Sequence, residues 1–69
     1  MNRKTNGVII PRGIEVRYAG GWVITSAAYR QKTLYREISY KGISKAEAVE
    51  RFVRAFGTDS QRAEYRNVS

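Results

Sequence analysis

The chain has 69 residues, enough for a single domain, and at that size folding buries only about 60% of the surface of the unfolded chain. It contains neither cysteine nor histidine, which excludes disulfide bonds and the commonest ligands of structural metal sites. The core must therefore come from the 42% of residues that are hydrophobic.

Basic residues outnumber acidic residues by 13 to 6, which gives a formal net charge of +7 at pH 7. Six of the seven excess charges precede Gly42, so the basic surface belongs to the first 41 residues. A charge excess of this density predicts a polyanionic partner, and we expect a nucleic acid. The same charge could instead serve only to keep a small protein in solution.

The first 13 residues form a basic arm ahead of the first clear strand pattern. Their apolar run is too short for the hydrophobic region of a signal peptide, and nothing in the chain approaches a membrane span. We therefore expect a cytoplasmic protein with no membrane partner. Residues 8–10 are a candidate for a short additional edge strand, because Pro11 cannot donate a hydrogen bond to a sheet ladder.

Three runs between residues 14 and 41 have the composition of β-strands. The segment GIEVRYA alternates Ile14, Val16 and Tyr18 with charged or small residues, which is the period of a half-buried strand. The segments WVITSAAYR and TLYREISYK follow, and both are rich in β-branched and aromatic residues. These patterns predict a three-stranded antiparallel sheet.

Loop length decides which side chains share a face of this sheet. A three-residue loop at 19–21, with a glycine in the left-handed conformation, pairs Tyr18 with Trp22. A two-residue Gly-Gly loop would shift the register by one and turn Trp22 outward, so packing favours the longer loop.

A matching loop at 31–33 pairs Arg30 with Leu34 and extends the second and third strands toward it. Ile24 then pairs with Tyr40 in the predicted register. The predicted inner face consists of Ile14, Val16, Tyr18, Trp22, Ile24, Ala28, Leu34, Ile38 and Tyr40.

The clearest local signal is a helix after the third strand. Ser44 is a suitable N-cap, Glu47 completes a capping box, and Gly57 follows the last helical turn. The apolar stripe that should cover the inner face consists of Ala46, Val49, Phe52, Val53 and Phe56. The predicted fold is thus α+β, with residues 14–57 forming a β-β-β-α domain. Residues 58–69 form a C-terminal tail, for which a frayed turn or short helix is expected because it has little to bury.

Enzymatic activity is not expected. Without histidine or cysteine, and with six acidic residues spread over the chain, no nucleophile–base pair, metal site or cofactor motif is apparent. We predict no catalytic residue, no cofactor and no small-molecule substrate.

The outer sheet face and its basic rim are the candidate binding surface. An arginine on a sheet can read guanine in the major groove, and exposed tyrosines can stack on unpaired bases. The centre of the face is neutral, because Arg17 and Lys41 balance Glu15 and Glu37, so a protein partner or a homodimer is the alternative. The candidate nucleic-acid-binding residues are Arg12, Arg17, Thr25, Tyr29, Arg30, Lys32, Tyr35, Ser39 and Lys41.

The segment GGWVITSAAYRQKTLYREISYKGISKAEAVERF resembles the arm-site-binding N-terminal domain of phage tyrosine recombinases and the ethylene-response-factor type of DNA-binding domain. The resemblance lies in a Gly-Trp entry to the second strand, a basic turn at 30–32, the helix start at 44–48 and Phe52. It implies that the sheet face lies in the major groove. Because no recombinase catalytic domain follows, it implies an accessory or regulatory DNA binder of a phage or mobile element.

The order of elements is also similar to that of HicB-type antitoxins, in which a sheet and helix pair through an edge strand. That resemblance implies a dimer and a toxin partner. It supports the alternative function, a small protein-interaction module whose positive charge is incidental.

Overall fold

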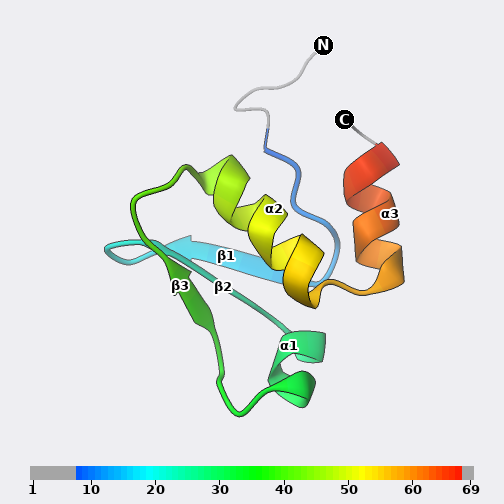
Figure 1. Cartoon of the computed structure of the whole chain (residues 1–69), viewed down its shortest axis with the longest axis horizontal. Helices are drawn as coiled ribbons and strands as arrows, with labels where there is room; N and C mark the ends of the chain where they lie inside the picture. Colours follow the sequence, from blue (N-terminus) through cyan, green and yellow to red (C-terminus); the bar gives the residue numbers. More distant parts are fainter. Residues whose placement is uncertain (1–7, 68–69) are drawn as a thin grey trace.

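The computed structural model describes residues 8–67 and has the predicted α+β fold, a three-stranded antiparallel sheet with helices (Figure 1). The strand order is β1-β2-β3, so β2 is central and β1 and β3 are the edges. The elements in chain order are β1 (Ile14–Tyr18), β2 (Trp22–Ser26), α1 (Ala27–Lys32), β3 (Ile38–Tyr40), α2 (Lys45–Phe56) and α3 (Asp59–Asn67).

The β1–β2 hairpin confirms the predicted register. Tyr18 pairs with Trp22 across the three-residue loop. Gly20 within this loop has a φ of 72°, a left-handed conformation that side chains other than glycine rarely adopt. The two aromatic rings at the end of the hairpin meet edge to face, with centroids 4.8 Å apart.

The predicted second hairpin is wrong, because β2 ends at Ser26 and the chain enters α1. The hydroxyl of Ser26 caps this helix by accepting a hydrogen bond of 3.1 Å from the backbone N–H of Tyr29. The connection to β3 therefore spans residues 27–37 in place of a three-residue turn. The pairing of β3 moves by two residues relative to the prediction, so that Ile24 pairs with Ile38 and Trp22 with Tyr40.

A shift of two residues preserves the alternation of side chains, so most of the predicted inner face is retained. Two residues are exceptions: Leu34 lies in the loop before β3 and is fully exposed, and Tyr18, at the end of the first hairpin, is 65% exposed. The core cluster between the sheet, α1 and α2 consists of Ile14, Ile24, Tyr29, Ala48, Val49, Phe52 and Val53.

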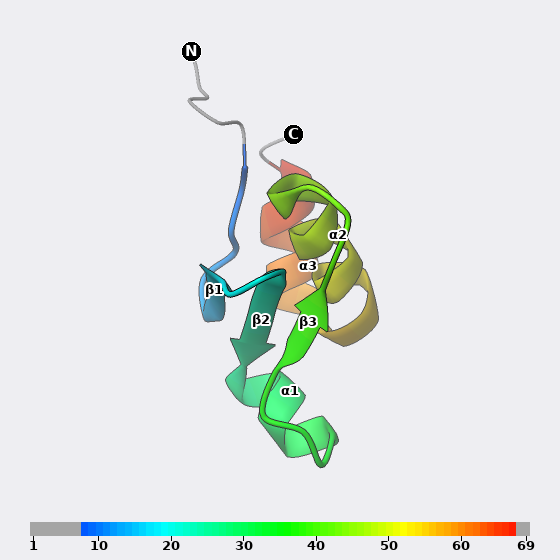
Figure 2. The ribbon, with the colours of Figure 1, turned by 90° about the vertical axis from the view of Figure 1, so that its left-hand side faces the viewer.

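Helix α2 covers the inner face of the sheet, and Phe52 and Val49 of the predicted stripe are completely buried (Figures 1 and 2). Ala46 of that stripe is exposed, and Ala48 is buried in its place. The hydroxyl of Ser44 accepts a 3.1 Å hydrogen bond from the backbone N–H of Glu47, which confirms the N-cap. The carboxylate of Glu47 pairs with Arg51 one turn later, at 2.8 Å.

Residues 58–67 form a docked helix rather than the frayed turn that the sequence favoured. Thr58 and Gln61 cap α3 reciprocally, with bonds of 2.9 and 3.1 Å. The side-chain amide of Gln61 also donates to the backbone carbonyl of Arg12, at 3.0 Å, and Tyr65 packs against the core. Residues 8–10, the candidate edge strand, run beside this helix without forming a strand.

Candidate nucleic-acid interface

The outer face of the sheet lies on the side away from α2 and α3, as Figure 2 shows. The register places Arg17, Val23 and Ser39 in one row across the three strands. Glu15 and Thr25 form the next row. These are the positions that the sequence assigned to this face.

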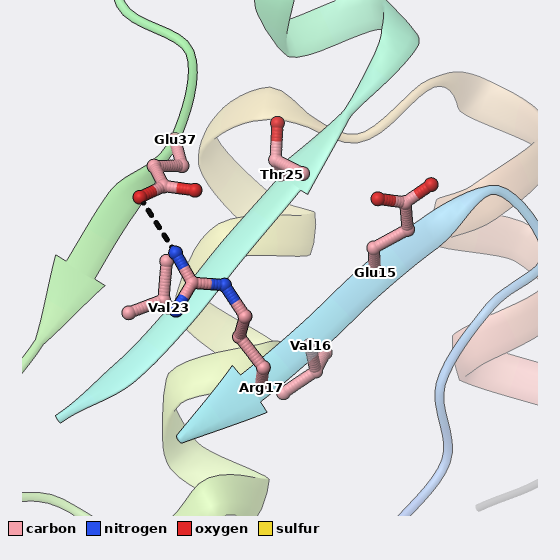
Figure 3. A pocket seen from close by; sticks show the side chains of 6 residues that line it. All are labelled: Glu15, Val16, Arg17, Val23, Thr25 and Glu37. Atoms are coloured by element: carbon pink, nitrogen blue, oxygen red, sulfur yellow. Dashed lines mark hydrogen bonds and ion pairs between the residues drawn. The ribbon is translucent and has the colours of Figure 1, made fainter. Parts of the chain in front are cut away.

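An ion pair lies across the centre of the outer face. A guanidinium nitrogen of Arg17 lies 2.9 Å from a carboxylate oxygen of Glu37, and the two side chains meet above Val23 (Figure 3). Val23 is only 7% exposed, although it lies on the sheet face that points away from α2 and α3. A shallow hollow of about 130 Å³ remains beside the pair, bordered also by Glu15 and Thr25. Arg17 is thus held by an acidic partner and is poorly placed to read a base.

Thr25 ties the sheet to the segment that follows it. Its hydroxyl donates a short hydrogen bond to the backbone carbonyl of Arg36 and accepts one of 3.1 Å from the guanidinium of Arg30. Both bonds are internal, so the hydroxyl is already used. Thr25 acts here as a structural link between β2, α1 and the loop before β3.

Tyr29 does not belong to the binding surface, contrary to the sequence prediction. Its side chain is only 3% exposed and packs against Phe52 and Phe56, with ring centroids 5.5 and 4.8 Å away. Its hydroxyl lies 3.5 Å from the backbone carbonyl of Glu37. A strand would have turned this ring outward, but the helical backbone of α1 turns it into the core. Tyr29 therefore cannot stack on a base.

The loop between α1 and β3, residues 33–37, presents two large side chains to solvent. Leu34 is 100% exposed and Tyr35 is 70% exposed. Leu34 was predicted to face the core, and the prediction failed because the second and third strands do not meet in a tight hairpin. Of the two predicted surface tyrosines, Tyr35 alone is accessible.

Three basic side chains lie on or beside this loop, and a fourth, Lys41, lies at the other end of β3. Arg30 and Lys32 lie on the last turn of α1, and Arg36 lies in the loop. Lys41 follows β3, and its stem lies close to Gly21 of the first hairpin. Sequence reasoning missed Arg36 because strand alternation assigned it to the inner face. Its position close to Arg30 and Lys32 in the sequence could have identified it as a member of the basic surface.

The accessible cations differ in whether an acidic side chain holds them. Within residues 8–67, the side chains of Lys32, Arg36 and Lys41 form no ion pair. Ser39 is exposed beside them on β3. Arg12 lies apart from this group, because its backbone is held by α3 through Gln61 and through a 3.2 Å hydrogen bond from its N–H to Glu64. Of the predicted cations, the structure thus places Arg30 and Lys32 beside the loop, whereas Lys41 lies near the first hairpin and Arg12 near α3.

The charge of the described chain is uneven. Residues 8–44 carry six basic and two acidic residues, a net charge of +4, whereas residues 45–67 carry five basic and four acidic residues, a net charge of +1. The predicted arm residues Arg3 and Lys4 lie outside the described residues. The positive potential is therefore concentrated on the sheet and α1.

Other kinds of site have little support in the described residues. No group of three or more acidic residues, the only metal-binding type left without histidine or cysteine, comes together among residues 8–67. Over the same residues, no helix is long and apolar enough to cross a membrane.

Comparison of the chain with protein-family models, curated protein sequences and solved structures found no match. The resemblances to recombinase arm-binding domains and to HicB-type antitoxins therefore stay predictions. The function has to be argued from the geometry and charge of the surface.

Proposed function

We propose that this protein is a small DNA-binding protein that grips the phosphate backbone with the cations of α1, the loop before β3 and the adjoining sheet edge. The gripping residues are Arg30, Lys32, Arg36 and Lys41, with Tyr35 and Ser39 beside them. The observation that carries the proposal is the net charge of +4 on residues 8–44, beside helices α2 and α3, which together carry a net charge of only +1. Phosphate contacts of this kind dominate affinity for nucleic acids and require no base reading.

The arrangement favours backbone contact over direct reading of bases by the sheet. Arg17 is paired with Glu37, and the hydroxyl of Thr25 is bonded on both sides. The short β3, with three residues, offers a small surface for a major groove. We therefore infer an accessory role in which affinity changes little with sequence, as for a protein that coats, shapes or stabilises DNA for other factors.

Salt dependence tests this proposal directly. Fluorescence anisotropy with a labelled 20-base-pair duplex should show binding near 50 mM salt. If four phosphates are neutralised, the log–log slope should be about −3.6, which weakens binding roughly 100-fold between 50 and 200 mM salt. Absence of binding at 50 mM salt would remove the proposal.

A matched pair of double variants locates the surface. Replacing Lys32 and Arg36 with alanine should reduce the magnitude of the slope by about 2, because each lost phosphate contact removes about 1. Replacing Arg51 and Arg54 with alanine removes the same charge from α2, where both residues are already paired with glutamates. The control should keep the wild-type slope. Equal losses in the two variants would mean that only net charge matters and that α1 and its loop are not the site.

A further inference from the structure

Leu34 is the most exposed large apolar side chain among the described residues, at 100%. The loop that carries it lies at the end of the sheet where α1 projects, away from the layer formed by α2 and α3 (Figures 1 and 2). An isolated exposed leucine is common on protein surfaces, and exposure alone indicates nothing. The backbone and the charges around Leu34 supply the argument.

The loop backbone is fixed on both sides of Leu34. The hydroxyl of Thr33 lies 3.1 Å from the backbone carbonyl of Tyr29, to which it can donate, and accepts a bond of the same length from the N–H of Tyr35. Beyond Leu34, the carbonyl of Arg36 accepts from Thr25. Few degrees of freedom remain in the loop, so a ligand that contacts Leu34 need not order this backbone first.

Two cations flank the leucine at equal distance along the chain. Lys32 precedes Leu34 by two residues and Arg36 follows it by two, and both are without ion pairs among residues 8–67. Two residues span at most about 7 Å. The minor groove of DNA is about 6 Å wide and is bordered by a phosphate backbone on each side. The backbone of each cation therefore lies within about 7 Å of that of Leu34, close enough for its side chain to contact a phosphate border when the leucine enters the groove.

From this geometry we propose that Leu34 is a wedge that enters the minor groove, inserts between two stacked base pairs and kinks the duplex. The proposal rests on the DNA binding proposed above and assigns its mode. Leucine is among the side chains that unstack a base step in this way, with kinks of about 20–90°. Lys32 and Arg36 hold the flanking phosphates, and the easily unstacked TA and CA steps are the preferred sites.

An anionic membrane is a less suitable partner for the same surface. One leucine and one tyrosine bury little apolar area in a bilayer, and stable attachment usually requires a larger apolar face or a lipid anchor. A wedge in DNA needs only one apolar side chain, because phosphate contacts supply the affinity. The observed set, Leu34 and Tyr35 between two cations, fits the second case.

Resonance energy transfer between dyes on the two ends of a 24-base-pair duplex with a central TA step tests the wedge. Wild-type protein should raise the transfer efficiency, as a bend of about 20° or more brings the ends together. Leu34→Ala should abolish this rise while anisotropy shows affinity reduced by less than about tenfold, since the phosphate contacts remain. Leu34→Met should retain the bend. Ile10→Ala, at an exposed apolar residue outside the loop, should behave as wild type.

The outcomes separate the wedge from DNA binding itself. Wild-type protein that binds the duplex without bending it, or Leu34→Ala that still bends it, overturns the wedge and leaves the proposed function intact. No binding at 50 mM salt overturns both. A Leu34-dependent attachment to vesicles of anionic phospholipid without DNA bending would assign the loop to a membrane. A Leu34-dependent dimer in sedimentation without DNA would assign it to a second copy of the chain. Either result would overturn the wedge.

Discussion

The helical layer and the sheet side of this protein handle their charged residues differently. On α2 and α3, three arginines pair with acidic residues three or four positions away along the same helix, as Arg51 does with Glu47. Among residues 8–44, the only ion pair is that of Arg17 and Glu37, which joins β1 to the loop before β3. The remaining cations of α1, its loop and Lys41 have no acidic partner there.

The unpaired cations gain no stabilisation from an acidic partner. Helical pairs at i,i+4 each stabilise by only about 0.3–0.5 kcal/mol, so even the paired layer gains little from its charges. Cations that gather without partners cost stability through mutual repulsion. A fold that retains them on one side, while balancing the other, is typical of a surface that meets an anion.

Tyr29 joins α1 to α2, and its replacement should lower the stability of the fold more than any other change considered. Tyr29→Ala should lower the free energy of unfolding by about 3 kcal/mol, because it leaves a cavity beside Phe52 and Phe56 and detaches α1 from α2. Urea denaturation followed by circular dichroism measures this loss. Tyr35→Ala, at the exposed tyrosine of the loop, should change stability by less than about 0.5 kcal/mol. Similar small effects for both variants would return Tyr29 to the surface, where the sequence had placed it.

Tyr29 also marks where sequence reasoning stopped being sufficient. The first hairpin and α2 were predicted correctly because their signals are local, namely a glycine pair in a tight loop and the Ser44 cap. Helix α1 is held by burial of Tyr29 between α2 side chains, which no local pattern encodes. Ser26 followed by two alanines could have indicated a helix start. The β-branched and aromatic residues around it led to the prediction of a strand instead.

The candidate site was predictable in composition but not in arrangement. Alternation placed Arg17 and Thr25 on the outer face correctly. It could not show that Arg17 is paired with Glu37 or that Thr25 holds the carbonyl of Arg36, because both contacts depend on where the eleven-residue connection returns to the sheet. The exposure of Leu34 depends on the same connection.

Breaking the Arg17–Glu37 pair should have a smaller effect, on the affinity for DNA. Glu37→Gln removes an acidic group from the basic side and releases Arg17, so affinity for duplex DNA should rise about twofold to fivefold at 50 mM salt. Glu50→Gln makes the same change on α2, beside Arg54, and should leave affinity nearly unchanged. Anisotropy titrations of the two variants measure the difference. If both variants tighten binding equally, the sheet side has no special role.

Tyr40 of β3 packs against the core and should have a small effect on how stability changes with pH. Burial raises its pKa above the ordinary value of about 10, the nearby Tyr29 raises it further, and Arg51 opposes both. The unfolded chain then loses this proton first, so stability is unaffected below about pH 10 and falls as the pH rises toward the folded-state pKa. Tyr40→Phe should make that fall shallower without abolishing it, because burial raises the pKa of Tyr65 in the same direction. Urea midpoints measured from pH 8 to 11 give the two profiles. Superimposable profiles would mean that Tyr40 ionises as easily in the folded protein as in the unfolded chain, and that its ring is not held between the sheet and α2.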